Sequence, residues 1–249
     1  MISKYFEFVK SDLDPIKSFY IKDELNPKVW EGFDINENVR EALLKIAEDF
    51  YGSTELNATI KDVILTGSLA NYNWSEKYSD YDLHILVNFK DINEDIVLVK
   101  KYVDGAKNNW NKEHDILIKG YEVEVYIQDV TETHKASGMF SLLKNRWITK
   151  PKKVEFEPDE EAISEKAKSV MMAIDDLEKE LDEDKYEKYK EKVGKVWDKI
   201  KNYRKSGLEE EGGEFSIGNL VFKLLRRNNY IKKIMDLKRS AYDKQFDVV

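Results

Sequence analysis

Two apolar runs that follow each other closely place the strongest constraint on the fold of this chain. DVILT at 62–66 is short and mostly apolar, and this pattern predicts a buried β-strand. Gly67 interrupts the run, so we expect the backbone to turn there and a short helix to begin at Ser68. DYDLHILVNF at 80–89 predicts a second strand. The core should therefore contain a strand, a turn with a short helix, and another strand.

The second strand starts with two aspartates on one face. Successive side chains of a strand point to opposite faces, so Asp80, Asp82 and His84 lie together and the other face is apolar. Two carboxylates this close repel each other, and the pKa of one rises unless a positive charge lies between them. The pair therefore suggests a bound cation, with His84 either a hydrogen-bonded neighbour or a direct participant.

A third carboxylate is available from a later stretch. DILIKGYEVEVYIQ at 115–128 predicts a hairpin that turns at 119–120, and Glu122 and Glu124 share the polar face of its second strand. If this strand is a neighbour of the one at 80–89, one of these glutamates can reach the aspartates. Carboxylate oxygens are ligands that Mg²⁺ prefers. Two such ions about 3.5–4 Å apart can activate a hydroxyl and stabilise a leaving pyrophosphate.

The Gly-Ser pair fits the same chemistry. Gly67 allows a sharp turn and a close approach of the backbone to a ligand. A helix that begins at Ser68 would direct free N–H groups and the positive end of its dipole toward phosphate. One end of the segment would then hold a triphosphate and the other end the metal ions.

The order of a strand, Gly67-Ser68, a short helix and Asp80-Tyr81-Asp82 resembles the DNA polymerase β-like nucleotidyltransferase superfamily. The signature of that superfamily is Gly-Ser or Gly-Gly, a gap of similar length, and Asp-x-Asp or Asp-x-Glu between apolar residues. GSLANYNWSEKYSDYDLH, and NLVFKLLRRNNYIKKIMDLK near the end, also look like uncharacterised phage-encoded members. The superfamily motif covers residues 62–128.

The resemblance implies an α+β fold, with a mixed-sheet nucleotidyltransferase domain followed by an α-helical domain. It also implies transfer of a nucleoside monophosphate from an NTP to a hydroxyl. Gly67 and Ser68 would contact the nucleotide phosphates, and Asp80 and Asp82 would bind Mg²⁺ or Mn²⁺. Glu124 in mid-strand would complete the metal site and assist deprotonation of the acceptor hydroxyl, with Glu122 as the other choice.

Two features depart from the superfamily pattern. Minimal members related to toxin–antitoxin systems usually carry Arg soon after Gly-Ser, where this chain has Asn71. The third carboxylate is often Asp, and here it must be Glu. The alternative function is a non-catalytic nucleotide-binding or antitoxin-like regulatory protein on the same fold, and a further one is a helical scaffold for protein interaction.

The composition changes along the chain after Pro151. Residues 1–150 hold the expected strands and an N-terminal extension, and residues 151–249 are rich in helix formers. We therefore expect a nucleotidyltransferase domain at 1–150 and a helical domain at 151–249. Helices are expected at 36–51, 94–110, 159–182, 185–205 and 217–245, the last capped by Ser216, and a further strand at 139–143.

Charge is unevenly distributed in this acidic chain, whose net charge is −8. Residues 219–244 contain eight basic and two acidic residues, a local excess of +6. We assign Lys223, Arg226 and Arg227 to nucleotide binding, because Arg and Lys bind phosphate oxygens. The same segment favours RNA, such as a tRNA 3′ end, as the acceptor, although a solvated helix face would show the same excess.

Composition excludes several classes of protein. The chain has no cysteine, which rules out disulfides, thiolate zinc sites and cysteine nucleophiles. It has no apolar run long enough to span a membrane and no apolar signal region at its start, so we expect a cytoplasmic protein. Neither GxxxxGK nor GxGxxG occurs, and HExxH and GxSxG are also missing.

Overall fold

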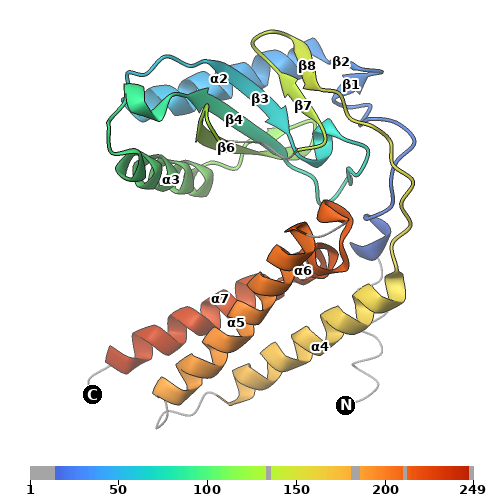
Figure 1. Ribbon diagram of the computed structural model, residues 1–249, viewed down its shortest axis with the longest axis vertical. Coiled ribbons are helices and arrows are strands. Elements are labelled where there is room, and N and C mark those ends of the chain that lie inside the picture. Colours follow the sequence, from blue (N-terminus) through green and yellow to red (C-terminus); the bar gives the residue numbers. More distant parts are fainter. Residues whose placement is uncertain (1–14, 133–135, 181–185, 210–211, 247–249) are drawn as a thin grey trace. The chain divides into compact units, whose positions relative to one another are not determined.

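The computed structural model describes residues 15–132, 136–180, 186–209 and 212–246 (Figure 1). They form two compact units, which we describe one at a time. The sheet unit is Ile21–Glu155, and the helical unit joins residues 15–20 to the described residues from Phe156 onward. Residues 15–20 therefore group with the helices, whereas the sequence suggested a single domain over 1–150.

The sheet unit contains β3 (Asp62–Thr66), β4 (Tyr81–Val87), β5 (Leu117–Ile118), β6 (Tyr121–Asp129), β7 (Met139–Ser141) and β8 (Arg146–Thr149). These strands form one sheet with the order β5-β6-β4-β3-β7-β8. β4 and β6 run parallel, and the other neighbouring pairs are antiparallel. The mixed sheet and the helices α2 (Glu37–Ser53) and α3 (Ile96–Glu113) make this unit α+β, as predicted.

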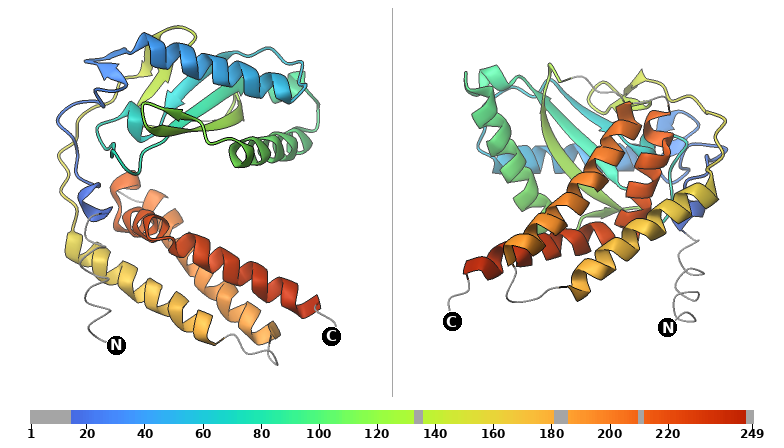
Figure 2. Two further views of the ribbon diagram at one scale, coloured as in Figure 1. Left: turned by 180° about the vertical axis from the view of Figure 1, so that it is seen from behind. Right: turned by 60° about the horizontal axis from the view of Figure 1, so that its bottom comes forward.

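One face of the sheet is apolar and covered by helices. Along β4, Tyr81, Leu83, Ile85 and Val87 are buried and the alternate residues are partly exposed, as the sequence pattern predicts. α2 and α3 add buried side chains to the same core, and α2 runs across the sheet in the left view of Figure 2. The opposite face of β4 therefore carries its polar side chains.

Local sequence signals position these elements. α2 begins after Asn36, whose side chain accepts a hydrogen bond from Val39 N, and this cap confirms the predicted start. α3 begins after Asp95, which accepts hydrogen bonds from two N–H groups of the first turn. The predicted hairpin of β5 and β6 turns at Lys119 and Gly120, which both have positive φ, as a two-residue turn requires.

Three short strands were not expected from the sequence. β8 extends the sheet beyond β7, and β1 (Trp30–Glu31) pairs with β2 (Asp34–Ile35) in a separate ladder. Strands of this length carry too few side chains to show a period. Their position depends instead on tertiary contacts, such as the stacking of Trp30 on Trp147 at 4.5 Å between ring centroids.

The helical unit contains α4 (Glu160–Lys179), α5 (Tyr186–Glu209), α6 (Ile217–Arg227) and α7 (Tyr230–Asp243). The first two confirm the helices expected at 159–182 and 185–205, and Asp159 caps α4. The apolar stripes of these helices form one core, to which Ile16 and Phe19 contribute. Among the residues described, no helix is both long and apolar enough to cross a membrane.

The end of the chain differs from the prediction. Ser216 caps α6, as expected, but the single helix over 217–245 is wrong, because α6 ends at Arg227 and α7 begins at Tyr230. Asn229 lies between them in the left-handed conformation, with φ 63°, and this interrupts the helical hydrogen bonds. Asn adopts this conformation more readily than most residues do, but residues 228–229 include no Gly or Pro, which are the usual signals that a helix ends.

Candidate functional site

The strand register brings two of the predicted carboxylates side by side. In the parallel pair of β4 and β6, Asp82 lies opposite Glu124. In the antiparallel pair of β3 and β4, the same Asp82 lies opposite Thr66, the last residue of β3. Asp82 and Glu124 are both half-buried. β4, which carries the aspartates, and β6, which carries the glutamates, are therefore neighbouring strands, as the metal site requires.

The Gly-Ser turn reaches the same place. Gly67 has φ +77°, and a β-carbon built on it would lie 1.9 Å from Asp82 Oδ2 and 2.9 Å from Asp82 Cγ. Real atoms cannot approach so closely, so any side chain at position 67 would force the Asp82 carboxylate to move, and the positive φ itself favours glycine. The structure thus places the turn after β3 directly against the aspartate at the start of β4.

Ser68 is tied to the loop that leads to the aspartates. It begins the predicted short helix, which is a 3₁₀ turn over Ser68–Ala70. Its Oγ lies 2.7 Å from Ser79 Oγ, and Ser79 Oγ also accepts a hydrogen bond from Ser75 N at 2.8 Å. Ser79 immediately precedes Asp80, which is half-buried. The serine pair therefore links the position of the turn to the position of Asp80.

Glu124 is held by a tyrosine to which the sequence analysis gave no role. The hydroxyl of Tyr126 donates a hydrogen bond to Glu124 Oε2. The Tyr126 ring stacks on His84, with centroids 4.7 Å apart and planes at 14°, and Lys107 Nζ lies 4.8 Å from its centroid. His84 Nδ1 in turn lies 2.9 Å from Gln128 Oε1. Tyr126 is thus fixed by contacts of its ring and its hydroxyl.

Burial raises the pKa of the Tyr126 hydroxyl far above its ordinary value. The hydrogen bond to Glu124 and the negative charges of Glu124, Asp82 and Asp80 raise this pKa further. Tyr126 therefore remains a neutral hydrogen-bond donor across the physiological range. Its position could have been noticed in the sequence, because it follows Glu124 by two residues on the same strand face.

Glu122 is placed differently from Glu124. It pairs with Leu117 of β5 rather than with a residue of β4, and its side chain is exposed. Of the two glutamates, Glu124 is therefore the one in register with Asp82.

The donor types at this site fit a hard divalent cation, because carboxylate oxygens are the ligands that Mg²⁺ and Mn²⁺ prefer. Asp82 and Glu124 are paired across adjacent strands, and Asp80 precedes Asp82 by two residues. Among the described residues, no group of three or more His, Asp or Glu side chains is gathered closely enough to enclose an ion. The carboxylates are thus neighbours of suitable chemistry rather than a closed cage.

Two further residues near the turn have structural roles. Asn71, which stands where minimal members of the superfamily that the sequence resembles usually carry Arg, is buried and donates a hydrogen bond from Nδ2 to Ser137 Oγ. Trp74 is also buried and donates from Nε1 to the carbonyl oxygen of Glu24 at 2.9 Å. Asn71 therefore fastens the turn, and Trp74 belongs to the core.

The predicted basic residues all lie on α6 in the helical unit. Arg226 is exposed, whereas the Arg227 guanidinium lies 4.3 Å from the Phe19 ring and donates to the Pro15 carbonyl oxygen at 3.0 Å. Burial lowers the pKa of Lys223; the cations of Arg227, Arg226 and Arg204 lower it further, and only Glu214 opposes them. Arg204, from α5, thus joins the cluster although the sequence analysis did not select it.

Comparison with known proteins gives no relative for this chain: no family model, no curated protein and no solved structure matches it.

Proposed function

We propose that this protein is a metal-dependent nucleotidyltransferase of the DNA polymerase β-like class. It would move a nucleoside monophosphate from an NTP to a hydroxyl acceptor and release pyrophosphate. One observation carries the proposal: the glycine turn after β3 lies against Asp82, and Asp82 lies in register with Glu124. A turn that can approach phosphate and a carboxylate pair that can hold cations are the two parts that this chemistry needs.

The turn supplies the phosphate end of the proposed site. Gly67 leaves the backbone bare beside the carboxylate, so a phosphate oxygen can approach the N–H groups at the start of the turn, whereas the Ala70 N–H already donates to the Gly67 carbonyl oxygen at 3.2 Å. The Ser68 hydroxyl, held by Ser79, adds a donor. These groups would orient the triphosphate so that its α-phosphorus faces the acceptor.

The carboxylates supply the metal end. Asp80, Asp82 and Glu124 would hold Mg²⁺ or Mn²⁺, which when bound neutralises phosphate charge and lowers the pKa of the acceptor hydroxyl. The acceptor oxygen forms a bond to the α-phosphorus while the bond from that phosphorus to the bridging oxygen breaks, and pyrophosphate leaves with that oxygen. The hydroxyl proton would pass to Glu124, whose Oε2 accepts a hydrogen bond from Tyr126.

The acceptor is proposed to be RNA, such as a tRNA 3′ end, because the helical unit gathers cations on α6. A protein hydroxyl or a small molecule would react by the same steps. The exposed Arg226 and the partly buried Lys223 are the residues of that cluster best suited to bind phosphate.

The hydrogen bond from Tyr126 to Glu124 favours one other function. It gives the Glu124 carboxylate a partner within the protein, so this side chain also has a structural role that suits a non-catalytic nucleotide-binding or antitoxin-like protein. Such a protein would bind NTP without turning it over.

The deciding experiment incubates the pure protein with Mg²⁺ or Mn²⁺, each α-³²P-labelled NTP in turn, and separate pools of total RNA, protein extract and small metabolites. We expect label in one pool and an equal amount of pyrophosphate. The matched control is Asp82→Asn, which keeps the shape of the side chain and removes its charge. NTP binding without label transfer or pyrophosphate in any pool would support the non-catalytic function instead.

A further inference from the structure

The helical unit contains a cavity of about 230 Å³ between α4, α5 and α6. Its wall is mostly apolar, with Val170 from α4, Ile200 from α5, and Phe222 from α6 among the lining side chains. Lys166 and Lys199 are its charged residues, and no acidic side chain of the described residues lines it. An apolar cavity with a few convergent polar groups is the usual form of a small-molecule site.

The cavity follows from the way the three helices pack. A β-carbon on Gly218 would lie 2.4 Å from the carbonyl oxygen of Tyr203, so α6 lies backbone to backbone against α5. On α4, the side chains that face the gap include Ser169 and Ala173, which are too short to fill it. The cavity therefore exists because positions 169 and 173 carry small side chains, and larger apolar residues there would fill it.

Among the described residues, the two lysines of the cavity have no acidic partner, unlike several other lysines of the same helices. On α5, Lys192, Lys195 and Lys201 each form an ion pair with a carboxylate. None of the ion pairs among the described residues involves Lys166 or Lys199.

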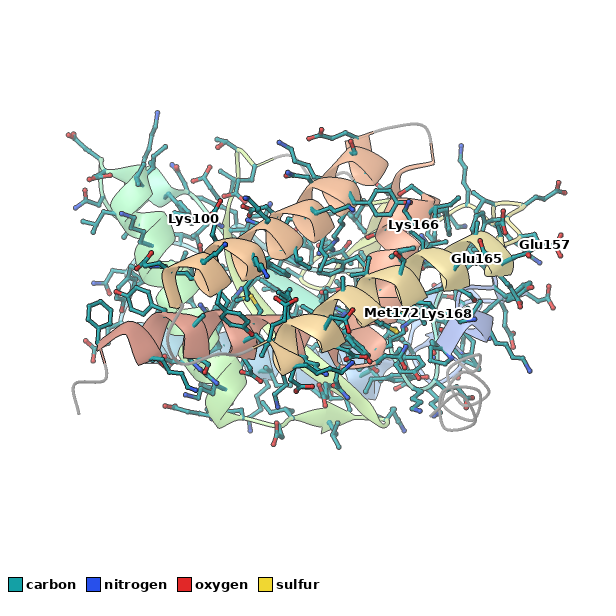
Figure 3. All side chains as sticks on the ribbon, turned by 90° about the horizontal axis from the view of Figure 1, so that it is seen from below. Lys100, Glu157, Glu165, Lys166, Lys168 and Met172 are labelled. Atoms are coloured by element: carbon teal, nitrogen blue, oxygen red, sulfur yellow. The ribbon has the colours of Figure 1, made fainter. Side chains whose placement is uncertain are left out.

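Lys166 extends from α4 beside α5 (Figure 3), with its Nζ 5.6 Å from the Tyr203 ring. In a protein of net charge −8, two cations beside one apolar cavity that form no ion pair within the described part of the chain are complementary to an anion with an apolar body.

We propose that this cavity binds a small anionic amphiphile, whose apolar body fills the hollow and whose carboxylate or phosphate lies between Lys166 and Lys199. A dry cavity of about 150 Å³ holds benzene, so this one accommodates about nine non-hydrogen atoms. That size suits a medium-length acyl chain and is too small for an apolar helix face. The proposal is independent of the nucleotidyltransferase activity, because every residue it uses lies in the helical unit.

The test measures binding of octanoate, octanol and octylammonium to the full chain by isothermal titration calorimetry. These probes share one apolar body and differ in the charge of their head group. We expect octanoate to bind at one site with a dissociation constant of about 1 mM or tighter. Octanol should bind about tenfold more weakly, and octylammonium should show no saturable binding, because the lysines repel it.

Two variants test the two parts of the site. Lys166→Gln with Lys199→Gln should weaken octanoate about tenfold and leave octanol unchanged. The matched control changes Lys168 and Lys205, on the same two helices but outside the cavity lining, to Gln, and should keep the wild-type affinity. Ala173→Phe should fill the hollow and abolish binding of both octanoate and octanol, while the unfolding temperature holds or rises.

Three outcomes would overturn the proposal. The first is that octanoate does not bind the wild-type chain. The second is that all three probes bind alike, or that the control pair of lysines matters as much as the cavity pair. The third is that Ala173→Phe converts a dimer to a monomer in analytical ultracentrifugation, because the hollow would then receive a second copy of the chain.

Discussion

Gly67 lies so close to Asp82 that a β-carbon at position 67 would stand 1.9 Å from the aspartate Oδ2. The turn and the carboxylate are thus in direct contact, and a side chain at position 67 would displace the Asp82 carboxylate. Mutation of Gly67 should therefore affect stability, and mutation of the carboxylates should affect activity.

Gly67→Ala should destabilise the protein by about 2–3 kcal/mol, because the new methyl group meets Asp82 and the backbone keeps a positive φ. Gly120→Ala is the matched control, because Gly120 also has a positive φ, of +90°, but has no atom within 4 Å of its added β-carbon. That change should cost about 1 kcal/mol. Urea unfolding measures both, and equal costs would show that the contact with Asp82 is unimportant.

Asp80→Asn and Asp82→Asn should each abolish nucleotidyl transfer at saturating Mg²⁺ while the protein stays folded. Removing one of several neighbouring carboxylates relieves repulsion, so the unfolding temperature without metal should hold or rise slightly. Transfer is followed with α-labelled NTP, and folding by circular dichroism. If either variant retains near-normal turnover, its carboxylate is not a metal ligand.

Glu124→Gln should lower turnover by about 100-fold or more, because Glu124 lies in register with Asp82 and would receive the acceptor proton. Glu122→Gln should change turnover by no more than about twofold, because Glu122 is exposed and pairs with β5. The two variants remove the same charge from the same strand face, so each controls for the other. A larger loss at Glu122 would move the third ligand there.

Tyr126→Phe should raise the Mg²⁺ concentration needed for half-maximal transfer by about tenfold, because it releases Glu124 from its hydrogen bond. Tyr102→Phe is the control, since it removes a hydroxyl that donates to the Thr54 carbonyl oxygen away from the carboxylates. If both changes leave the metal requirement unmoved, Tyr126 has only a packing role.

Two tyrosines, the buried Tyr81 and the half-buried Tyr126, should make the sheet unit sensitive to alkali. Burial raises the pKa of Tyr81 and of Tyr126 above the value of about 10 in the unfolded chain. The contribution of these tyrosines to the free energy of unfolding is fully present below pH 10. It is lost as the pH rises toward their pKa in the folded protein, because the hydroxyls lose their protons first in the unfolded chain. Each should lower the free energy of unfolding by about 1.4 kcal/mol per pH unit above pH 10.

Tyr81→Phe provides a sharp test of this pH dependence. Among the described residues the Tyr81 hydroxyl has no hydrogen-bond partner, so its loss should leave stability at pH 7 equal or higher. Between about pH 10 and 11 the variant should lose stability less steeply than the wild type in urea unfolding. An unchanged slope would mean that Tyr81 ionises in the folded protein.

The elements of the sheet unit were largely predictable, because local signals and tertiary contacts agree there. Asn36 caps a helix whose apolar residues recur at helical spacing, and positions 119–120 supply the turn that a hairpin needs. The break at Asn229 was not predicted, because an Asn in the left-handed conformation does not change the spacing of the apolar residues around it.

The site was predictable in residue type but not in arrangement. Alternation along a strand places Asp80 with Asp82, and Glu122 with Glu124, on single faces. The pairing of Asp82 with Glu124 depends on the parallel register of β4 and β6, which involves residues far apart in sequence. The role of Tyr126 follows only from that register, because its hydroxyl matters through the carboxylate that it reaches.

The division of the chain into units gives it the topology of an inserted domain. The sheet unit is one continuous piece, Ile21–Glu155, whereas the helical unit is discontinuous and includes Ile16 and Phe19 in its core. A fragment that spans residues 21–155 therefore keeps every strand together. A truncation after residue 150 instead separates Ile16 and Phe19 from the helices whose core they share. A direct junction of residue 20 to residue 156, with the sheet unit left out, is the route by which the helical unit can be made as a separate, uninterrupted polypeptide.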